Sequence, residues 1–177
     1  MNGSKWIAAL ALAAASGAVL AADEGVYLGA GLGDAKARGT GLTKSSDTAL
    51  KIFAGYQFNK HVGIEGEFVK LEKLEDAGAT YKAMGWGLAA IGAWPIKDNI
   101  LLYGKLGIMQ TTTDTNPVAG SAVLFARQYK TSGAFGLGGQ FNIDPNTGIR
   151  LGWDRYKVPI ATANDMNVYS VAAVFKF

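Results

Sequence analysis

Eight short runs of this sequence alternate between two kinds of residue, and all charge is confined to one of the two alternating phases. The runs cover residues 26–33, 50–58, 62–69, 84–94, 102–109, 134–141, 149–154 and 167–177. A strand points successive side chains to opposite sides, so each run predicts a strand with two different faces. An Arg or Lys on a lipid-facing position costs about 2–4 kcal/mol at the bilayer midplane. The segregation therefore predicts eight strands with hydrocarbon against one face.

The last run, NVYSVAAVFKF, shows the pattern most clearly. Counting back from the final residue in steps of two gives an unbroken apolar phase that ends in an aromatic ring. Its members are Tyr169, Val171, Ala173, Phe175 and Phe177. The opposite phase is mixed and carries Lys176. A strand of this kind needs an apolar environment on one side only.

The connections between the runs alternate in length. Long polar stretches occupy residues 34–48, 71–82, 111–127 and 156–166, whereas the turns around 59–61, 95–99 and 144–148 are short. Pro95 has no N–H to donate, so we expect the strand to end there. Together these features predict an all-β fold, an eight-stranded antiparallel transmembrane β-barrel with long loops outside and short turns in the periplasm. Side chains nearly fill a lumen of this size, so a wide pore is not expected.

The N-terminus predicts export. Lys5 precedes an apolar run over residues 7–20, and the small residues Ala21 and Ala22 follow it. We interpret residues 1–22 as a signal peptide, cleaved after Ala21 or Ala22, and residues 23–177 as one barrel domain. An uncleaved membrane anchor is the alternative, but the apolar run is shorter than the roughly 20 residues that span a bilayer.

Composition excludes several classes of function. Cysteine is absent, His61 is the one histidine, and the net charge is only +3 without a clustered basic face. We therefore predict no metal site, no cofactor, no catalytic residue and no nucleic-acid partner. The glycine-rich phrases at 29–34 and 136–139 lack the Lys and Ser/Thr of a phosphate-binding loop, so we interpret them as strand faces kept small.

Three phrases carry a resemblance to a known family: GYQFNKHVGIEGEF (55–68), AWPIKDNILLYGKLG (93–107) and GIRLGWDRY (148–156). With the closing strand, they resemble the transmembrane domain of the outer membrane protein A superfamily, which includes small eight-stranded barrels of the OmpX and NspA type. The resemblance implies an outer-membrane barrel of a Gram-negative bacterium. It also implies that the barrel assembly machinery reads the last strand during insertion.

The same resemblance assigns some lumenal residues. Glu65 matches a glutamate that joins basic side chains inside the family's barrel, and Lys105 and Arg150 match lumenal basic positions. Other charged positions of the family fall on Ile91, Gln140 and Gly152, and Asp154 is the candidate replacement for the last of these.

The phase rule predicts seven lumenal charges. They are Lys51, Glu65, Glu67, Lys105, Arg150, Asp154 and Lys176. Buried charges must be paired, so we expect a crossed network centred on Glu65, Lys105 and Arg150. One interpretation is structural, with the pairs neutralising the lumen. The other is a narrow ion path gated by exchange of partners.

We expect a non-enzymatic surface and envelope-integrity role, with the exposed loops mediating adhesion; a narrow channel for ions or small solutes is the alternative. Lipid A acyl chemistry would need serine and histidine at the outer face, whereas His61 falls on a periplasmic turn.

The expected surroundings are outer-membrane lipid and lipopolysaccharide, whose phosphates Lys70 and Arg155 could meet. Basic loop residues favour anionic extracellular partners, which the sequence does not identify. They are Lys36, Arg38, Lys44, Lys73, Lys82, Arg127 and Lys157.

Overall fold

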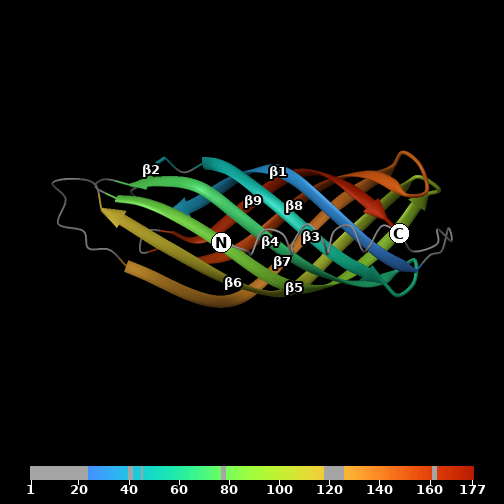
Figure 1. The fold of residues 1–177 in the computed structure, drawn as a ribbon, viewed down its shortest axis with the longest axis horizontal. Helices are drawn as coiled ribbons and strands as arrows, with labels where there is room; N and C mark the ends of the chain where they lie inside the picture. Colours follow the sequence, from blue (N-terminus) through green and yellow to red (C-terminus); the bar gives the residue numbers. More distant parts are fainter. Residues whose placement is uncertain (1–23, 40–41, 45, 77–78, 118–125, 161–162) are drawn as a thin grey trace, which may run out of the picture.

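The computed structural model describes residues 24–39, 42–44, 46–76, 79–117, 126–160 and 163–177 (Figure 1). The predicted signal peptide, residues 1–22, lies outside the described residues. The described strands are β1 (Gly25–Gly39), β2 (Leu42–Lys44), β3 (Ser46–Gln57), β4 (Val62–Asp76), β5 (Ala79–Lys97), β6 (Ile100–Pro117), β7 (Ala126–Asn142), β8 (Thr147–Ile160) and β9 (Ala163–Lys176). A helix that could cross a bilayer does not occur in these parts of the chain.

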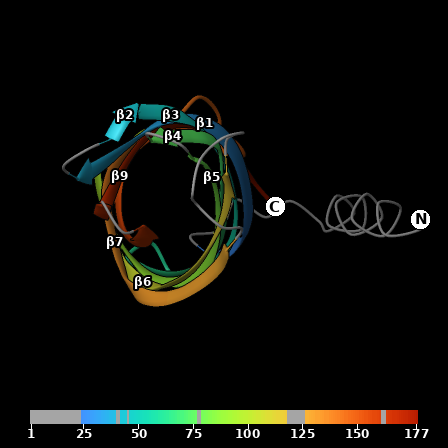
Figure 2. The same ribbon diagram turned by 90° about the vertical axis from the view of Figure 1, so that its left-hand side faces the viewer.

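Eight of these strands close into an antiparallel barrel. Each long strand pairs with its neighbours in sequence, and β9 pairs with β1 to complete the ring. Viewed end-on, the wall runs continuously around the interior (Figure 2). β2 pairs with β4 at only two positions and is an addition to the rim at the end opposite the short turns (Figure 1). Closure removes the unpaired edges that an open sheet would expose.

The two faces of the wall match the predicted phases. In β5, Ala83, Ala89 and Ile91 are buried, while the intervening Trp86 and Leu88 are 60% and 51% exposed on the outside. The same alternation holds along the other seven runs. Large apolar side chains therefore cover the outside of the barrel, and every charged residue of the runs except Lys176 is buried inside. The predicted fold class is confirmed, and so are the predicted inward and outward faces of the strands.

Two details of the predicted ladder are wrong. β5 does not end at Pro95, because Pro95 pairs with Leu101 and the strand continues to Lys97. A register shift between Pro95 and Lys97 accommodates the missing N–H, so the turn reduces to Asp98 and Asn99. A bulge near a strand end is one of the places where proline is tolerated.

The predicted long loops are mostly strand. β4 extends to Asp76 and β5 begins at Ala79, so most of the stretch 71–82 belongs to the wall. β6 likewise continues through Thr111 and Thr113, which point inward, to Pro117. The ladder depends on backbone hydrogen bonds and not on an apolar outer face, so pairing continues after the outward positions become polar.

The short turns are fixed by side chains that mimic backbone acceptors. Asn59 Oδ1 accepts from the N–H groups of His61 and Val62 at 2.8 and 3.0 Å. Asp144 Oδ1 accepts from the N–H groups of Asn146 and Thr147, both at 2.8 Å. Such Asx turns reverse the chain in few residues, which keeps this end of the barrel compact.

Adjacent glycines in β7 provide a test of the two faces. A Cβ on Gly138 would point inward and lie 2.5 Å from the Tyr103 hydroxyl, in conflict also with the carbonyl oxygen of Leu151. A Cβ on Gly139 would point outward, 3.6 Å from the nearest atom, on Leu102. We expect Gly138→Ala to lower the unfolding free energy by about 1–3 kcal/mol through overpacking.

The matched control is Gly139→Ala, which should change the unfolding free energy by less than about 0.5 kcal/mol. Urea unfolding followed by tryptophan fluorescence measures both. Equal losses in the two variants would contradict the assignment of the faces.

Candidate functional site

The barrel interior concentrates the charged side chains of the described strands. Lys51 comes from β3, Glu65 and Glu67 from β4, Lys105 from β6, and Arg150 and Asp154 from β8. Each of the six is at most 8% exposed. All six lie on the inward phase, so strand alternation alone delivers them to one space. Three bases face three acids, and the cluster is formally neutral.

Four of these residues form a compact group. Asp154 contacts both lysines. It forms an ion pair with Lys51 and a second ion pair, of 2.8 Å, with Lys105. Glu67 also contacts both, at 3.3 Å from Lys51 and in an ion pair with Lys105. Each carboxylate thus bridges two ammonium groups, and these cross-strand pairs join β3, β4, β6 and β8 across the lumen.

Glu65 and Arg150 form a second group next to the first. Arg150 Nη1 donates to Glu65 Oε2 at 2.5 Å, and the Tyr27 hydroxyl donates to the same oxygen at 3.0 Å. Arg150 Nε donates to Gln140 Oε1 at 3.0 Å. Gln140 therefore provides a neutral acceptor at a position where the resemblance implied a glutamate. Lys105, 3.9 Å from Glu65, connects the two groups.

Three aromatic rings surround the Arg150 guanidinium. Its central carbon lies 5.2 Å from the ring centroid of Tyr27, 4.7 Å from that of Phe53 and 4.8 Å from that of Tyr103. Cation–π attraction is stronger away from water, so the rings stabilise the charge as well as fill the lumen. Sequence reasoning missed this cage. The available signal was aromatic residues on the inward phase opposite glycines, such as Phe53 opposite Gly29.

An apolar layer fills the interior on the side of the charges away from the short turns. Its members are Ala35, Ala49, Val69, Leu71, Ala83, Met109, Ala134, Tyr156, Met166 and Val168. A cavity of about 10 Å³ lies among its side chains, close to the smallest volume that holds one water molecule. Sequence reasoning missed this layer because each strand contributes only one or two of its members.

The remaining predicted residues lie elsewhere. Lys176 is exposed at the short-turn end of β9, where it lines a cavity, and it is not among the six buried charges. The predicted centre also differs in detail, since Lys105 lies closer to Glu67 and Asp154 than to Glu65. Lys51, which the prediction placed outside the centre, bridges two acids.

Four of the five residues of the predicted assembly signal lie on the outer face of β9, and Phe177 directly follows this strand. Tyr169, Val171 and Phe175 are 50%, 55% and 49% exposed, and Ala173 is exposed between them. Phe177 is partly exposed, and its N–H donates to the carbonyl oxygen of Val26 at 2.9 Å.

His61, the one histidine, lies apart from the interior acids. His61 lies on the exposed turn between β3 and β4, where Nδ1 is 3.1 Å from the carbonyl oxygen of Ala93 and the ring is 6.4 Å from that of Trp94. Each interior acid is paired with a base, and no group of three or more His, Asp or Glu side chains in the described strands is arranged for a metal ion. The interior chemistry is therefore that of neutralised ion pairs.

Comparison with known proteins gives a consistent result. The family model described as the outer membrane protein beta-barrel domain matches residues 7–177. Outer membrane protein A of Shigella flexneri is 31% identical over 136 residues, which are 71% of this chain and 39% of that protein. The chain spans less than half the length of such relatives.

Two solved structures show the same fold at low identity. Neisserial surface protein A covers 86% of this chain and 97% of its own, with a TM-score of 0.73 and 17% identity. The attachment invasion locus protein of Yersinia pestis, in complex with the heparin analogue sucrose octasulfate, covers 88% of this chain and 99% of its own, with a TM-score of 0.66 and 20% identity.

Two arginines of β8 test the energetic difference between interior and rim. Arg150→Gln removes a buried partner of Glu65, so we expect the unfolding free energy in detergent micelles to fall by about 3–5 kcal/mol. Arg155, which donates to Asp165 at 2.6 Å, has a side chain that is 32% exposed. Arg155→Gln should cost at most about 1 kcal/mol. Similar losses in the two variants would contradict a desolvated network.

Proposed function

Because this chain belongs to the outer membrane protein β-barrel family, we propose that it is a non-enzymatic surface protein whose outer rim contacts other molecules. The barrel lies in the bacterial outer membrane, in a lipid and lipopolysaccharide environment. Short turns face the periplasm in such barrels, so the end that bears β2 faces outward. The rim at that end is the part of the protein available to the surroundings of the cell.

One observation carries this proposal: two packed layers close the interior. The six buried charges are paired with one another, and the apolar layer beyond them has a cavity of only about 10 Å³ among its side chains. A solute moving through the barrel would have to break the ion pairs and then cross an apolar plug. A closed interior leaves the outer surface as the place of function.

The outer rim carries cations suited to an anionic partner. Lys36 is exposed on β1, with Nζ 3.5 Å from Asp34 and 5.7 Å from the ring centroid of Tyr169. Lys70 is exposed on β4 between Leu50 and Met84 of the neighbouring strands. A structural neighbour was solved with a heparin analogue. We propose that sulfated or phosphorylated glycans, including the phosphates of lipopolysaccharide, bind at this rim.

The last strand has a second proposed role in assembly. Tyr169, Val171 and Phe175 form an apolar row on the outside of β9, and this strand pairs with both β1 and β8. The row is accessible before the barrel closes in lipid. We propose that the barrel assembly machinery reads it during insertion.

Binding of labelled heparin to intact bacteria that display the protein tests the rim. We expect Lys36→Gln combined with Lys70→Gln to weaken binding roughly fivefold, since each exposed charge contributes about 0.5 kcal/mol. Lys97→Gln, at the periplasmic end, is the control and should bind as wild type. A double variant that binds as tightly as wild type would contradict the proposed rim site.

A narrow ion channel is the alternative function. The position of Lys105 favours a channel. Its ammonium group lies within 4 Å of Glu65, Glu67 and Asp154, so it can exchange one acidic partner for another. Such exchange would let an ion move past the ion pairs while the Lys105 ammonium group keeps an acidic partner. The apolar layer opposes it.

Planar-bilayer recording separates the two functions. With the interior closed, wild-type protein should show no steady ion conductance, and Glu65→Ala should show none either. Steady single-channel currents in wild type that change in Glu65→Ala would establish the channel and overturn the closed barrel.

A further inference from the structure

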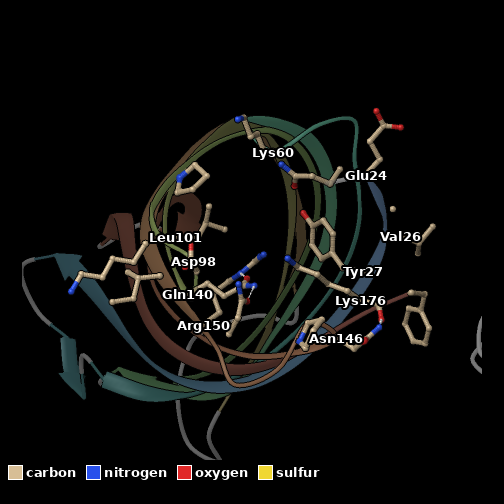
Figure 3. Close-up of a pocket in the computed structure, with 18 residues that line it drawn as sticks. Glu24, Val26, Tyr27, Lys60, Asp98, Leu101, Gln140, Asn146, Arg150 and Lys176 are labelled. Atoms are coloured by element: carbon tan, nitrogen blue, oxygen red, sulfur yellow. Dashed lines mark hydrogen bonds between the residues drawn. The ribbon is translucent and has the colours of Figure 1, made fainter. Parts of the chain in front are cut away.

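The seam between β7 and β8 closes over only part of its length. At the short-turn end these strands pair up to Asn142 and Gly148, beside a pocket of about 220 Å³ inside the barrel (Figure 3). At the opposite end the last pair is Phe135 with Arg155, although β7 and β8 both continue beyond it. Among the described strands, residues 126–134 therefore pair with β6 alone. We call these residues the β7 edge.

The hydrogen bonds of β7 show which backbone groups face the unpaired side. Asn142 N–H donates to the carbonyl oxygen of Asn99, just before β6, at 2.9 Å. Ile143 N–H donates to that of Thr147 in β8, also at 2.9 Å. The side to which backbone groups point alternates along a strand, and the register of β7 with β6 has no shift. Odd-numbered residues of the β7 edge therefore direct their N–H and C=O groups to the unpaired side, as on the edge of an open sheet.

Two comparable edges at this end of the barrel are blocked. β4 continues beyond its last pair with β3, Leu71 with Ala49, and there it pairs with β2. β8 has a register shift against β9 between Lys157 and Ile160, and it contains Pro159, which has no N–H. Bulges and prolines keep strand edges from pairing with other chains. The β7 edge has neither, since its register is regular and it contains no proline.

The β7 edge lies beyond the membrane-spanning part of the barrel. The rings of Phe135 and Trp153, whose centroids are 5.5 Å apart, lie where the pairing with β8 ends. Aromatic rings gather at the interface between membrane and water. Beyond them the outward side chains of β7 are Thr131 and Tyr129, both exposed. A polypeptide in the surroundings of the cell can therefore reach this edge.

Charge selects the chemistry of the partner. The β7 edge contains Arg127 and Lys130 and no acidic residue, and the facing stretch 156–160 of β8 contains Lys157 and no acidic residue. Lys130 is partly exposed and has no ion-pair partner among the described residues. Opposite charges across a ladder stabilise it, so an acidic strand complements this edge.

A second copy of this chain fits the edge less well. If two β7 edges paired antiparallel along their whole length, Lys130 of one copy would lie directly opposite Lys130 of the other. Like charges in that position destabilise a ladder. The charge that favours an acidic partner thus opposes pairing between copies.

We propose that the β7 edge binds an extended acidic segment of another polypeptide, which adds to the barrel as a further strand. In such β-augmentation the backbone hydrogen bonds supply affinity, and side chains at alternate positions supply specificity. The proposal shares with the rim function only the placing of this end outside the cell. It uses the backbone of β7, whereas the glycan site uses Lys36 and Lys70.

Amide hydrogen exchange of the refolded full chain in non-ionic detergent tests the edge. In the free protein the N–H groups of Tyr129 and Thr131 should exchange fast, whereas those of Lys130 and Ser132, which face β6, should exchange slowly. A saturating eight-residue peptide of alternating valine and glutamate should slow exchange at Tyr129 and Thr131 by about tenfold or more. A peptide of alternating valine and lysine should leave it unchanged.

Variants separate the backbone from the charge. Thr131→Pro removes an N–H on the unpaired side and should weaken binding of the valine–glutamate peptide about fivefold or more. Thr131→Ala keeps that N–H and is the matched control, which should bind as wild type. Lys130→Glu should reverse the preference and favour the valine–lysine peptide. Lys97→Gln, at the short-turn end, should bind as wild type.

Three results would overturn the proposal. Slow exchange at Tyr129 and Thr131 in the free protein would show that the edge is already paired. If that protection disappeared on dilution, the occupant would be a second copy, and if it persisted, the chain would close the seam itself. Failure of the valine–glutamate peptide to protect these groups, or equal weakening by Thr131→Pro and Thr131→Ala, would also contradict strand addition.

Discussion

The exclusion of charge from the outer face of the membrane-spanning part of every strand determines the rest of this structure. Hydrocarbon surrounds the barrel, and an ionised side chain there would lose its hydration without gaining a partner. The large outward side chains are therefore mostly Leu, Ile, Val, Phe and Trp, with Leu106 72% and Trp94 69% exposed to the surroundings of the barrel. In a water-soluble protein such side chains would form the core, so the usual arrangement of inside and outside is reversed.

The interior follows from the same constraint. Charges that occur in the spanning part of a strand must point inward, where they are desolvated and need partners. Lys51, Lys105 and Arg150 balance Glu65, Glu67 and Asp154, and each carboxylate accepts from more than one group. Glycines on the inward phase leave the space that these long side chains and the rings around Arg150 require, as Gly138 does for Tyr103. With the apolar layer beyond them, they fill the middle of the lumen.

Much of the barrel was predictable from the sequence. The face to which a strand residue points depends only on whether its position along the strand is odd or even. Alternation predicted the outward and inward sets, the approximate strands, and an inward Glu65 and Arg150. It did not predict that Lys51 bridges Glu67 and Asp154, since partners across the lumen depend on the stagger between strands that are distant in sequence. It placed strand ends too early, as at Pro95 and in β4, because backbone pairing continues where apolar alternation stops. The apolar layer and the pocket at the short-turn end arise from several strands together and leave no local signal.

Single cysteines test the central claim most directly, and the chain has no native cysteine to interfere. Ile52, Leu88 and Leu137 lie on the outer face in the spanning part, and Thr131 lies on the same face of β7 nearer the rim. In folded protein reconstituted in vesicles, a water-soluble maleimide should label Cys at position 131 and leave positions 52, 88 and 137 unlabelled. Labelling of those three positions as fast as position 131 would show that water, and not hydrocarbon, lies against the outer face, and would contradict the account.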